Sequence, residues 1–258
     1  MRVISLYSGS SGNCTLIETK ESTFLVDAGG SAKALIGALD KLGSGIDRVS
    51  DIFITHEHSD HTHALSALLK KHPCRVHITE QSAEALNVCD VLEDHLVRHG
   101  TSFQLDMGEC HIEAFPVPHD SRACVGYRFE EGGVSVGVVT DIGYVTQTVY
   151  DRLCGCEAVI IEANHDREMV RCGSYPAALK ARILSGGGHL SNDDCAEISG
   201  AWARQGTKRI LLAHLSDENN TPSTALEAVR AATDPYGVTV YAAKRDEPTV
   251  LLESNDNT

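Results

Sequence analysis

The stretch that decides the fold reads Ile52-Phe53-Ile54-Thr55-His56-Glu57-His58-Ser59-Asp60-His61. Its first four residues form the apolar and β-branched pattern of a buried strand, and polar side chains follow without a break. Metal ions need deprotonated nitrogen and oxygen donors gathered at one point, and a loop that leaves a strand can fold its side chains around one cavity. A continuing strand would instead point successive side chains to opposite faces. The segment therefore predicts a metal site at a strand end. The candidate ligands in it are His56, His58, Asp60 and His61.

The composition is that of an ordinary globular protein. With 258 residues, of which 42% are hydrophobic and 22% charged, the chain can bury a substantial core. Its apolar runs are too short for a transmembrane helix, and residues 1–7 do not resemble a signal peptide. The nine cysteines stand at irregular spacing, which argues against a complete set of disulfides. We therefore expect a cytoplasmic protein that does not associate with membranes.

The formal net charge is −14 at pH 7. Such a charge disfavours long-range attraction to nucleic-acid phosphates and excludes a globally basic binding face. It leaves room for a local site, because two divalent metal ions would bring about four positive charges to one cleft. The scattered basic residues that are candidates for nucleic-acid contacts, each more typical of a solvated surface charge, are Arg122, Arg128, Lys180, Arg182 and Lys208.

Apolar segments with strand periodicity recur along the chain, and helical patterns become frequent in its second half. The predicted strands are Arg2–Tyr7, Thr15–Glu18, Thr23–Val26, Asp51–Thr55, Arg75–Thr79, Cys110–Val117, Cys124–Phe129, Val134–Thr140, Ala158–Ala163, Arg209–Ala213, Val238–Tyr241 and Val250–Leu252. The predicted helices are Ser31–Leu42, Thr62–Lys70, Gln81–Leu86, Val145–Leu153, Tyr175–Ser185, Asn192–Gln205 and Pro222–Thr233. We expect a single domain, residues 1–258, in which two sheets pack together under outer helices, with one doubly wound sheet as the alternative.

The motif H-x-H-x-D-H after a strand resembles the signature of the metallo-β-lactamase-fold superfamily. The resemblance implies an α/β (α+β) fold, the four-layer αββα sandwich, with the site at the strand ends. It also implies three further ligands downstream: a histidine, an aspartate and a last histidine. The sequence offers one candidate for each directly after a strand, namely His119, Asp141 and His214. His99 and His111 compete with His119, and a simple turn residue is the alternative for Asp141.

The resemblance also divides the candidate ligands between two metals. The assignments that it implies are His56, His58 and His119 for one ion, Asp60, His61 and His214 for the other, Asp141 as a bridge, and Asp27 as a carboxylate that orients a ligand histidine. Histidine and aspartate suit zinc, manganese or iron, since no soft sulfur ligand is present. Two such ions about 3.5–4 Å apart lower the pKa of a bridging water and clamp substrate oxygens. The predicted chemistry is hydrolysis.

A glycine-rich turn near the N-terminus, Ser8-Gly9-Ser10-Ser11-Gly12-Asn13, is a candidate anion site. Such a turn between two strands can direct backbone N–H groups and hydroxyls at an anion. We expect Ser10, Ser11 and Asn13 to contact the substrate, and an ordinary hairpin connection is the alternative.

A second glycine-rich segment, Gly186-Gly187-Gly188-His189-Leu190-Ser191-Asn192, precedes a predicted helix. Glycine lets a backbone approach closely, and a helix N-terminus attracts anions. His189 is placed to protonate a leaving oxygen or contact a phosphate, with a capping or packed histidine as the alternative. Ser191, Asn192 and the more distant His165 complete the expected substrate contacts.

In their order along the chain, these motifs are similar to those of one branch of the superfamily, the YycJ (WalJ) proteins. The matching segments, which span nearly the whole chain, are Ser8–Asn13, Leu25–Gly29, Thr55–His61, Pro118–Asp120, Thr140–Gly143, Glu162–Asp166, Gly188–Asn192 and His214–Asn220. The resemblance implies a metal-dependent nuclease that acts on DNA as a 5′→3′ exonuclease. The expected partner is therefore a nucleic acid, DNA in particular, while the oligomeric state has no signal in the sequence.

The chain is more distantly similar to the ribonuclease Z group. There a glutamate at a strand end and a histidine in a Gly-His-Ser-Thr motif form a proton relay, and the matching positions are Glu162 and His189. Leu190-Ser191 departs from the Ser-Thr of that group, and no insertion is long enough for its tRNA-gripping arm. These departures argue against processing of tRNA 3′ ends.

The resulting mechanistic hypothesis assigns three catalytic residues. A scissile phosphate bridges the two metals, hydroxide attacks phosphorus, and Glu162 orients His189, which protonates the leaving oxygen. Asp60 serves as a ligand and as a contact to the nucleophile. Hydrolysis of a small ester, thioester or lactone is the rival activity, which the negative net charge favours. A metal-stabilised binding protein is the second rival, which a complete set of seven ligands disfavours.

Overall fold

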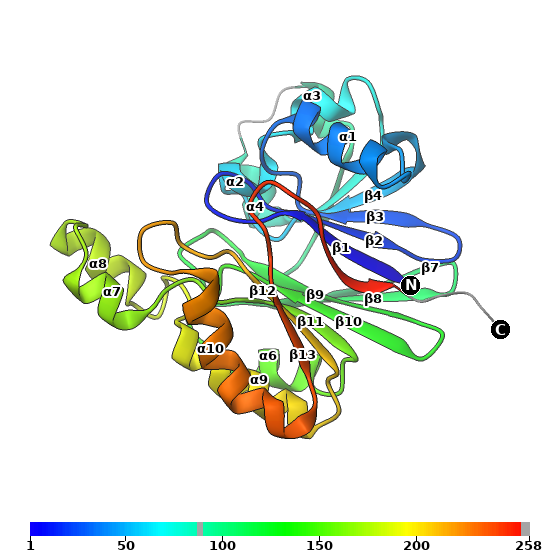
Figure 1. Cartoon of the computed structure of the whole chain (residues 1–258). Coiled ribbons are helices and arrows are strands. Elements are labelled where there is room, and N and C mark those ends of the chain that lie inside the picture. Colours follow the sequence, from blue (N-terminus) through cyan, green and yellow to red (C-terminus); the bar gives the residue numbers. More distant parts are fainter. Residues whose placement is uncertain (87–89, 254–258) are drawn as a thin grey trace.

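The computed structural model describes residues 1–86 and 90–253 of the chain. In this part, two mixed β-sheets lie face to face, and helices cover both outer faces (Figure 1). The arrangement confirms the predicted αββα sandwich. The alternative of one doubly wound sheet is wrong, because the strands divide between two sheets.

The first sheet comes from the N-terminal half of the chain and one C-terminal strand. In spatial order its described strands are β14 (Thr249–Glu253), β1 (Arg2–Tyr7), β2 (Cys14–Glu18), β3 (Thr23–Val26), β4 (Val49–Phe53), β5 (Arg75–Thr79) and β6 (Leu96–His99). The pairs from β14 to β3 are antiparallel, and the pairs from β3 to β6 are parallel. The carboxyl ends of β3 and β4 therefore lie at the same edge.

The second sheet likewise has a parallel half and an antiparallel half. In spatial order its described strands are β13 (Thr239–Ala242), β12 (Arg209–Ala213), β11 (Ala158–Glu162), β10 (Val134–Val139), β9 (Val125–Glu131), β8 (Cys110–Pro116) and β7 (Phe103–Met107). The pairs from β13 to β10 are parallel, and the pairs from β10 to β7 are antiparallel. The carboxyl ends of β10, β11 and β12 are thus neighbours.

The helices form the two outer layers. On the side of the first sheet lie α1 (Ala32–Lys41), η1 (Ile46–Arg48), α2 (Ser59–Thr62), α3 (Leu65–Leu69), α4 (Glu80–Ala85) and α5 (Asp90–Glu93). The later helices are α6 (Gln147–Leu153), α7 (Arg167–Cys172), α8 (Ala177–Ile183), α9 (Asn192–Arg204), α10 (Pro222–Thr233) and η2 (Asp234–Tyr236). In Figure 1, α6, α9 and α10 cover the second sheet, whereas α7 and α8 project beyond the sandwich. None of the helices in the described residues has the length and apolarity needed to span a membrane.

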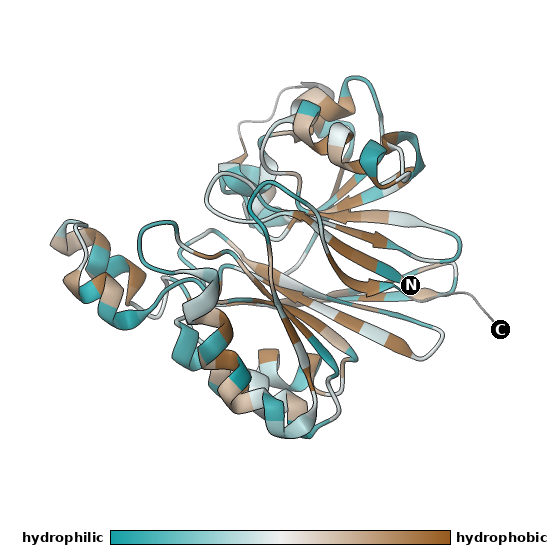
Figure 2. Cartoon of the chain, viewed as in Figure 1, coloured by the Kyte–Doolittle hydropathy of each residue, from teal (hydrophilic) through white to brown (hydrophobic). Residues whose placement is uncertain are grey.

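The layer between the sheets is a packed aromatic and aliphatic core, visible as apolar strands facing each other in Figure 2. Phe24 and Phe53 of the first sheet meet Tyr127 and Phe129 of the second, with ring centroids 5.5–6.1 Å apart. All four side chains are fully buried. Edge-to-face aromatic pairs add about 0.5–1.5 kcal/mol each beyond the burial of area. This contact fixes the distance between the two sheet edges that carry the polar residues.

Local signals in the sequence predicted most elements, including two helix starts. Ser191 caps α9 through a hydrogen bond from the Asp194 N–H, and Thr221 caps α10 in front of Pro222. The eight described cysteines are free thiols, as expected, and Cys89 lies outside the described residues.

Some elements depart from the sequence predictions. The strands β6 and β7 were not predicted, because their side chains are only partly buried and polar residues interrupt their apolar pattern. The predicted helix Thr62–Lys70 is divided into α2 and α3, and α2 begins inside the metal motif at Ser59. Helix α7 was also not predicted, although Asp166 caps it through a hydrogen bond from the Met169 N–H.

Two histidines outside the motif, the buried His77 and the partly buried His99, stack on aromatic rings. The His77 ring lies 4.6 Å from the Phe53 ring, and the His99 ring lies 3.8 Å from that of Phe103. His77 Nδ1 is 3.0 Å from His99 Nε2, and His77 Nε2 is 3.0 Å from the Asp51 carboxylate. Both histidines therefore have structural roles, and it is His119, not His99, that lies in a potential metal-binding cluster.

The His99 stack predicts a pH dependence of stability. Burial, reinforced by His77, lowers the pKa of His99 to about 4, whereas the unfolded value is about 6.5. Between these values the unfolded chain binds a proton that the folded chain does not. The contribution of His99 is therefore complete above the unfolded pKa and is lost as the pH falls towards 4.

We predict that His99→Phe, which keeps the stacked ring, makes stability less sensitive to acid. Urea unfolding of the metal-free protein at several values between pH 4 and pH 7 measures this. The variant should lose less unfolding free energy on acidification than the wild type. His111→Phe, at a partly exposed position on β8, should leave the slope unchanged. Equal slopes for the wild type and His99→Phe would contradict the account.

Candidate metal centre and adjoining cavity

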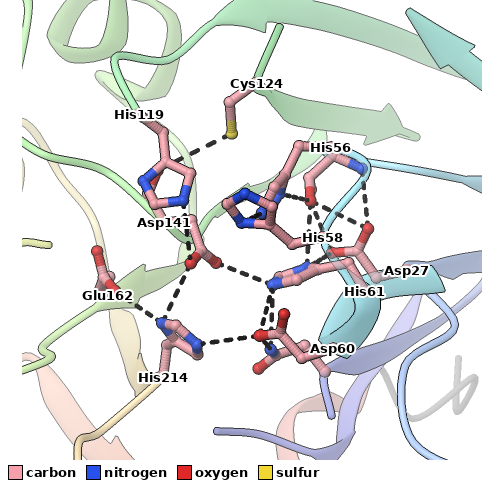
Figure 3. A network of polar contacts seen from close by, with 12 residues as sticks. Asp27, His56, His58, Asp60, His61, His119, Cys124, Asp141, Glu162 and His214 are labelled. Atoms are coloured by element: carbon pink, nitrogen blue, oxygen red, sulfur yellow. Dashed lines mark hydrogen bonds and ion pairs between the residues drawn. The ribbon is translucent and has the colours of Figure 1, made fainter. Parts of the chain in front are cut away.

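The polar side chains gather where strands of both sheets end. Asp27 follows β3, the motif His56–His61 follows β4, Asp141 follows β10, and His214 follows β12. Glu162 is the last residue of β11. Figure 3 shows these side chains converging from both sheets on one centre. The structure thus brings together the residues that the sequence analysis singled out at five separate strand ends.

The backbone turns sharply at three of these strand ends. Asp27, Asp141 and His214, with φ of 63°, 54° and 53°, are the non-glycine residues with positive φ in the described part of the chain. A left-handed conformation is unfavourable for a residue with a Cβ atom, and such strain persists only where surrounding contacts enforce it. All three outliers lie at the same centre, which marks it as a functional site.

The nitrogen and oxygen atoms of these side chains form two adjoining clusters. The groups whose ligand atoms lie within 4.8 Å of one another include His56, His58 and His119 in one, and Asp60, His61 and His214 in the other. These are the two sets assigned to separate metals in the sequence analysis. Asp141 lies between them, with Oδ2 3.1 Å from His61 Nε2 and Oδ1 3.7 Å from His119 Nε2.

The donor set fits divalent cations. His119 Nε2 and His214 Nε2 are buried and make no hydrogen bond. An unpaired buried polar atom costs about 1–3 kcal/mol, so an unmet requirement for a partner remains at the centre. His56 Nε2 and His58 Nδ1 approach to 2.9 Å, which brings two imidazole nitrogens to one point. Imidazoles and carboxylates in this arrangement suit divalent ions such as zinc or manganese.

Each of four candidate ligand imidazoles is held through its other nitrogen. The contacts are His61 Nδ1 to Asp27 Oδ2 at 2.8 Å, His214 Nδ1 to Glu162 Oε1 at 2.8 Å, His119 Nδ1 to the Gly188 carbonyl at 3.1 Å, and His56 Nδ1 to Thr55 Oγ1 at 3.0 Å. A hydrogen bond at one ring nitrogen fixes the tautomer and the orientation of the other. The four Nε2 atoms are thereby directed into the centre.

In the first sheet, Asp27 is the carboxylate that orients a candidate ligand histidine. It is buried, and its Oδ1 accepts hydrogen bonds from the backbone N–H and the hydroxyl of Thr55. Its Oδ2 lies 2.8 Å from His61 Nδ1. The contact is the one expected for a carboxylate that orients a histidine of the motif.

Glu162 is the corresponding group in the second sheet, and its role is wider than expected. Its Oε1 lies 2.8 Å from both His189 Nδ1 and His214 Nδ1. Its Oε2 accepts hydrogen bonds from the backbone N–H groups of Ile142 and Leu190. The contact of Glu162 with His189 was predicted and that with His214 was not, although Glu162 ends β11 and His214 follows the neighbouring strand β12. This carboxylate therefore links a candidate ligand to the candidate acid.

The electrostatics divide the candidate ligands: against the effect of burial, nearby carboxylates raise the pKa of His61, and that of His214 to about 10, so these two rings favour the protonated form at the metal-free centre. Burial, together with the nearby His61, lowers the pKa of His56, and burial also lowers the pKa of His119, so both rings favour the neutral form that binds metals. Burial alone would raise the pKa of Glu162, but His189 and His214 hold it at about 2. Burial alone would lower the pKa of His189, and the Glu162 carboxylate raises it instead.

The glycine-rich turn of residues 8–13 supports the centre through Asn13. The buried Asn13 amide donates to Asp60 Oδ2 at 3.2 Å and to the Gly9 carbonyl at 3.1 Å. Asn13 therefore holds a candidate metal ligand, and its contact with a substrate stays a prediction. Ser10 and Ser11 are exposed at the tip of the turn.

Asn192 is also engaged within the protein. Its side chain forms a reciprocal pair of hydrogen bonds, each 2.9 Å long, with that of Asn220. Asn220 in turn donates to the Ala163 and Asn164 carbonyls. The amide nitrogen and oxygen of Asn192 thus each have a buried partner, and its contact with a substrate stays a prediction.

A cavity of about 610 Å³ opens beside the centre on the side of His189. Two of the expected substrate contacts, His165 and Ser191, line it. The Ser191 hydroxyl is already committed to Asp194 Oδ2, at 2.6 Å, while it caps α9. His189 lines the cavity and retains 19% exposure of its side chain, so a molecule in the cavity can reach it.

The chain is similar in sequence to curated nucleases. Residues 22–215 match the family model described as Beta-lactamase superfamily domain. Exodeoxyribonuclease WalJ of Streptococcus pneumoniae is 39% identical over 226 residues, which cover 85% of this chain and 83% of that protein. Exodeoxyribonuclease YycJ of Bacillus anthracis is 35% identical over 240 residues, which cover 92% and 91%.

Solved structures share the fold. The metallo-β-lactamase-fold protein YhfI from Bacillus subtilis superposes with a TM-score of 0.71 at 15% identity, covering 96% of this chain and 99% of that one. Zn²⁺-bound PqqB from Methylobacterium extorquens gives a TM-score of 0.71 at 18% identity, with the same coverage. Human tRNase Z, short form, gives a TM-score of 0.66 at 17% identity, covering 98% and 100%. These likenesses concern the fold alone.

The close approach of two loops at Gly29 provides a test of how the centre is assembled. A Cβ atom at Gly29 would lie 1.7 Å from the Asp60 carbonyl oxygen and 2.6 Å from the Asn13 nitrogen. We predict that Gly29→Ala displaces the motif loop, lowers the metal content of the purified protein and costs at least about 1–3 kcal/mol of stability. Metal analysis and thermal unfolding measure both effects.

Gly37→Ala is the matched control, because no atom lies within 4 Å of a Cβ atom at that position in α1. Alanine is favoured over glycine in a helix by about 1 kcal/mol, so this variant should keep its metal and unfold at the same or a higher temperature. Wild-type metal content and stability in Gly29→Ala would show that the loops are not packed as described.

Proposed function

This chain belongs to the metallo-β-lactamase superfamily of hydrolases, and we propose that it is a two-metal nuclease that removes nucleotides from the 5′ end of DNA. The observation that carries the proposal is the Glu162–His189 pair, with Oε1 and Nδ1 2.8 Å apart, set between the ligand clusters and the cavity. A proton donor on the open side of a metal centre suits a reaction with a poor leaving oxygen.

The two clusters would hold the metals. His56, His58 and His119 form one site, and Asp60, His61 and His214 form the other, with Asp141 shared between them. Bound divalent ions would lower the pKa of a water held between them and offset the negative charge of a phosphodiester. Protein side chains would then contact the attacking water and donate the proton to the leaving oxygen.

His189 is the proposed acid, and it has the contacts that this role needs. Glu162 accepts from Nδ1, so Nε2 is the atom available to a substrate oxygen. Because the Glu162 carboxylate raises the pKa of this imidazole, it favours the protonated ring, whose Nε2–H can be donated to the leaving oxygen. Water attacks phosphorus and gives a proton to solvent, the bond to the leaving oxygen breaks, and the His189 proton passes to that oxygen. His189 then regains a proton from solvent. Asp60, held by Asn13, is positioned to contact the attacking water.

Local charge supports a nucleic acid only weakly against the net charge of −14. Residues 167–184, which include the projecting helices α7 and α8, contain four basic residues and one acidic residue. Figure 1 shows this pair of helices projecting from the end of the sandwich, and its Arg167 and Leu184 line the cavity. Its three arginines are each ion-paired with a carboxylate, so this short basic arm would attract phosphates only weakly.

A small ester or thioester is the competing substrate class, and it needs no basic arm. The curated relatives named as exodeoxyribonucleases favour DNA, since this chain spans most of their length. An assay that offers 5′-phosphorylated DNA and a chromogenic thioester to the same zinc- or manganese-loaded protein separates the two classes.

We predict that His189→Ala lowers the turnover of 5′-phosphorylated DNA by about 10²–10⁴-fold, the usual contribution of a general acid, with two metals still bound. DNA labelled at either end gives the polarity. A 5′ label should appear directly in a mononucleotide, and a 3′ label should appear in a series of shortened strands.

Two variants complete this experiment. Asp60→Ala should lose metal as well as activity, whereas His111→Ala, at a partly exposed position on β8, should retain both. Full activity in metal-replete His189→Ala would remove the acid role. Faster hydrolysis of the thioester than of any DNA would replace the proposed substrate class.

A further inference from the structure

Two loops that form the wall of the cavity beside His189 pack with unusually close backbone contacts. A Cβ atom at Gly143 would lie 2.0 Å from the Gly186 carbonyl oxygen, so the loop after Asp141 packs directly on the second glycine-rich segment. This contact places the Tyr144 ring over Gly186, at the cavity wall. Its volume of about 610 Å³ is within the range of sites for small ligands.

One buried side chain in this wall lacks a partner. His165 is 2% exposed and lines the cavity, and its Nδ1 makes no hydrogen bond. Its backbone is fixed by the hydrogen bond from the Asn192 N–H to the His165 carbonyl, and the Asn192–Asn220 amide pair holds the segment from behind. A rigidly held imidazole with an unsatisfied nitrogen at a cavity wall is expected where a ligand supplies the missing contact.

The remaining lining suits an uncharged, aromatic ligand. Tyr144 presents 53% of its surface at the rim, and Leu184 and Ile198 contribute apolar surface. Arg167 is neutralised by Asp194, whose carboxylate it contacts at 2.6 Å and 2.8 Å, and the exposed Glu197 adds a further negative charge. The cavity therefore offers stacking and hydrogen bonding with no excess of positive charge for a phosphate.

We propose that this cavity binds the nucleoside of the departing nucleotide, with the base against Tyr144 and His165 in contact with the sugar or base edge. The proposal rests on the proposed function, since it places the phosphate at the metal centre and the leaving oxygen at His189. A base presents an aromatic face whatever its identity, so stacking binds it without selecting sequence.

The position of His189 determines which nucleoside is bound. The proton from His189 goes to the oxygen that leaves phosphorus, so the nucleoside that carries this oxygen lies on the His189 side, where the cavity is. In a digestion from the 5′ end, the leaving oxygen is the 3′ oxygen of the terminal nucleotide. The cavity then holds the 5′-terminal nucleoside, and the rest of the strand extends from the opposite side of the centre.

The test combines loss of the base with loss of the tyrosine. The substrates are one 5′-phosphorylated single strand, the same strand with an abasic residue at its 5′ end, and the same strand with an abasic residue at its 3′ end. The proteins are the metal-loaded wild type, Tyr144→Ala, His165→Gln and Tyr236→Ala, the last being an exposed tyrosine of η2 that does not line the cavity. The value of kcat/KM is measured for each combination.

For the wild type, the 5′ abasic residue should lower kcat/KM roughly tenfold, the usual effect of one base stack, and the 3′ abasic residue should have no effect. Tyr144→Ala should lose a similar factor on the intact strand and nothing further on the 5′ abasic strand, because the two changes remove the same contact. His165→Gln should behave in the same direction, and Tyr236→Ala should match the wild type.

Three results would overturn the inference. The wild type could degrade the intact and 5′ abasic strands equally well, the 3′ abasic strand alone could be slowed, or Tyr144→Ala could slow all three strands by one common factor, as general damage would. Each of these leaves the nuclease proposal standing, because DNA is still degraded. Absence of any DNA turnover by the metal-loaded wild type would instead remove the proposed function and this inference with it.

Discussion

Two buried carboxylates, one in each sheet, hold the centre in place. Asp27 fixes His61 through Nδ1 from the first sheet, and Glu162 fixes His214 and His189 in the same way from the second. Each carboxylate is also satisfied by backbone N–H groups, so it cannot move without losing several hydrogen bonds in a buried setting. The imidazoles that face the centre are therefore oriented by the protein before any metal binds.

The centre also depends on how the sheets pack. Each cluster takes donors from strand ends of both sheets, so the distance between the ligands within a cluster depends on the aromatic layer around Phe53 and Tyr127. The sharp turns at Asp27, Asp141 and His214 store strain that these contacts sustain. The same core contacts therefore support both the stability of the sandwich and the geometry of the centre. A core substitution that separates the sheets would also separate the ligands.

Features that are encoded in consecutive residues could be predicted from the sequence, whereas features created by tertiary contacts could not. The strand followed by H-x-H-x-D-H and the capped helices were predictable because each is written in consecutive residues. The amide pair of Asn192 and Asn220 and the contact of Asn13 with Asp60 join residues 28 and 47 positions apart, so neither contact was predictable from the sequence. The second partner of Glu162 was missed for the same reason. Cavity residues such as Tyr144 had no local signal.

The central claim is that the two clusters hold a pair of divalent ions between the sheets. Anomalous X-ray diffraction from crystals grown with manganese measures this most directly. The account predicts two peaks about 3.5–4 Å apart, one within bonding distance of His56, His58 and His119 and the other close to Asp60, His61 and His214. A single peak, or manganese bound elsewhere while this centre stays empty, would contradict it.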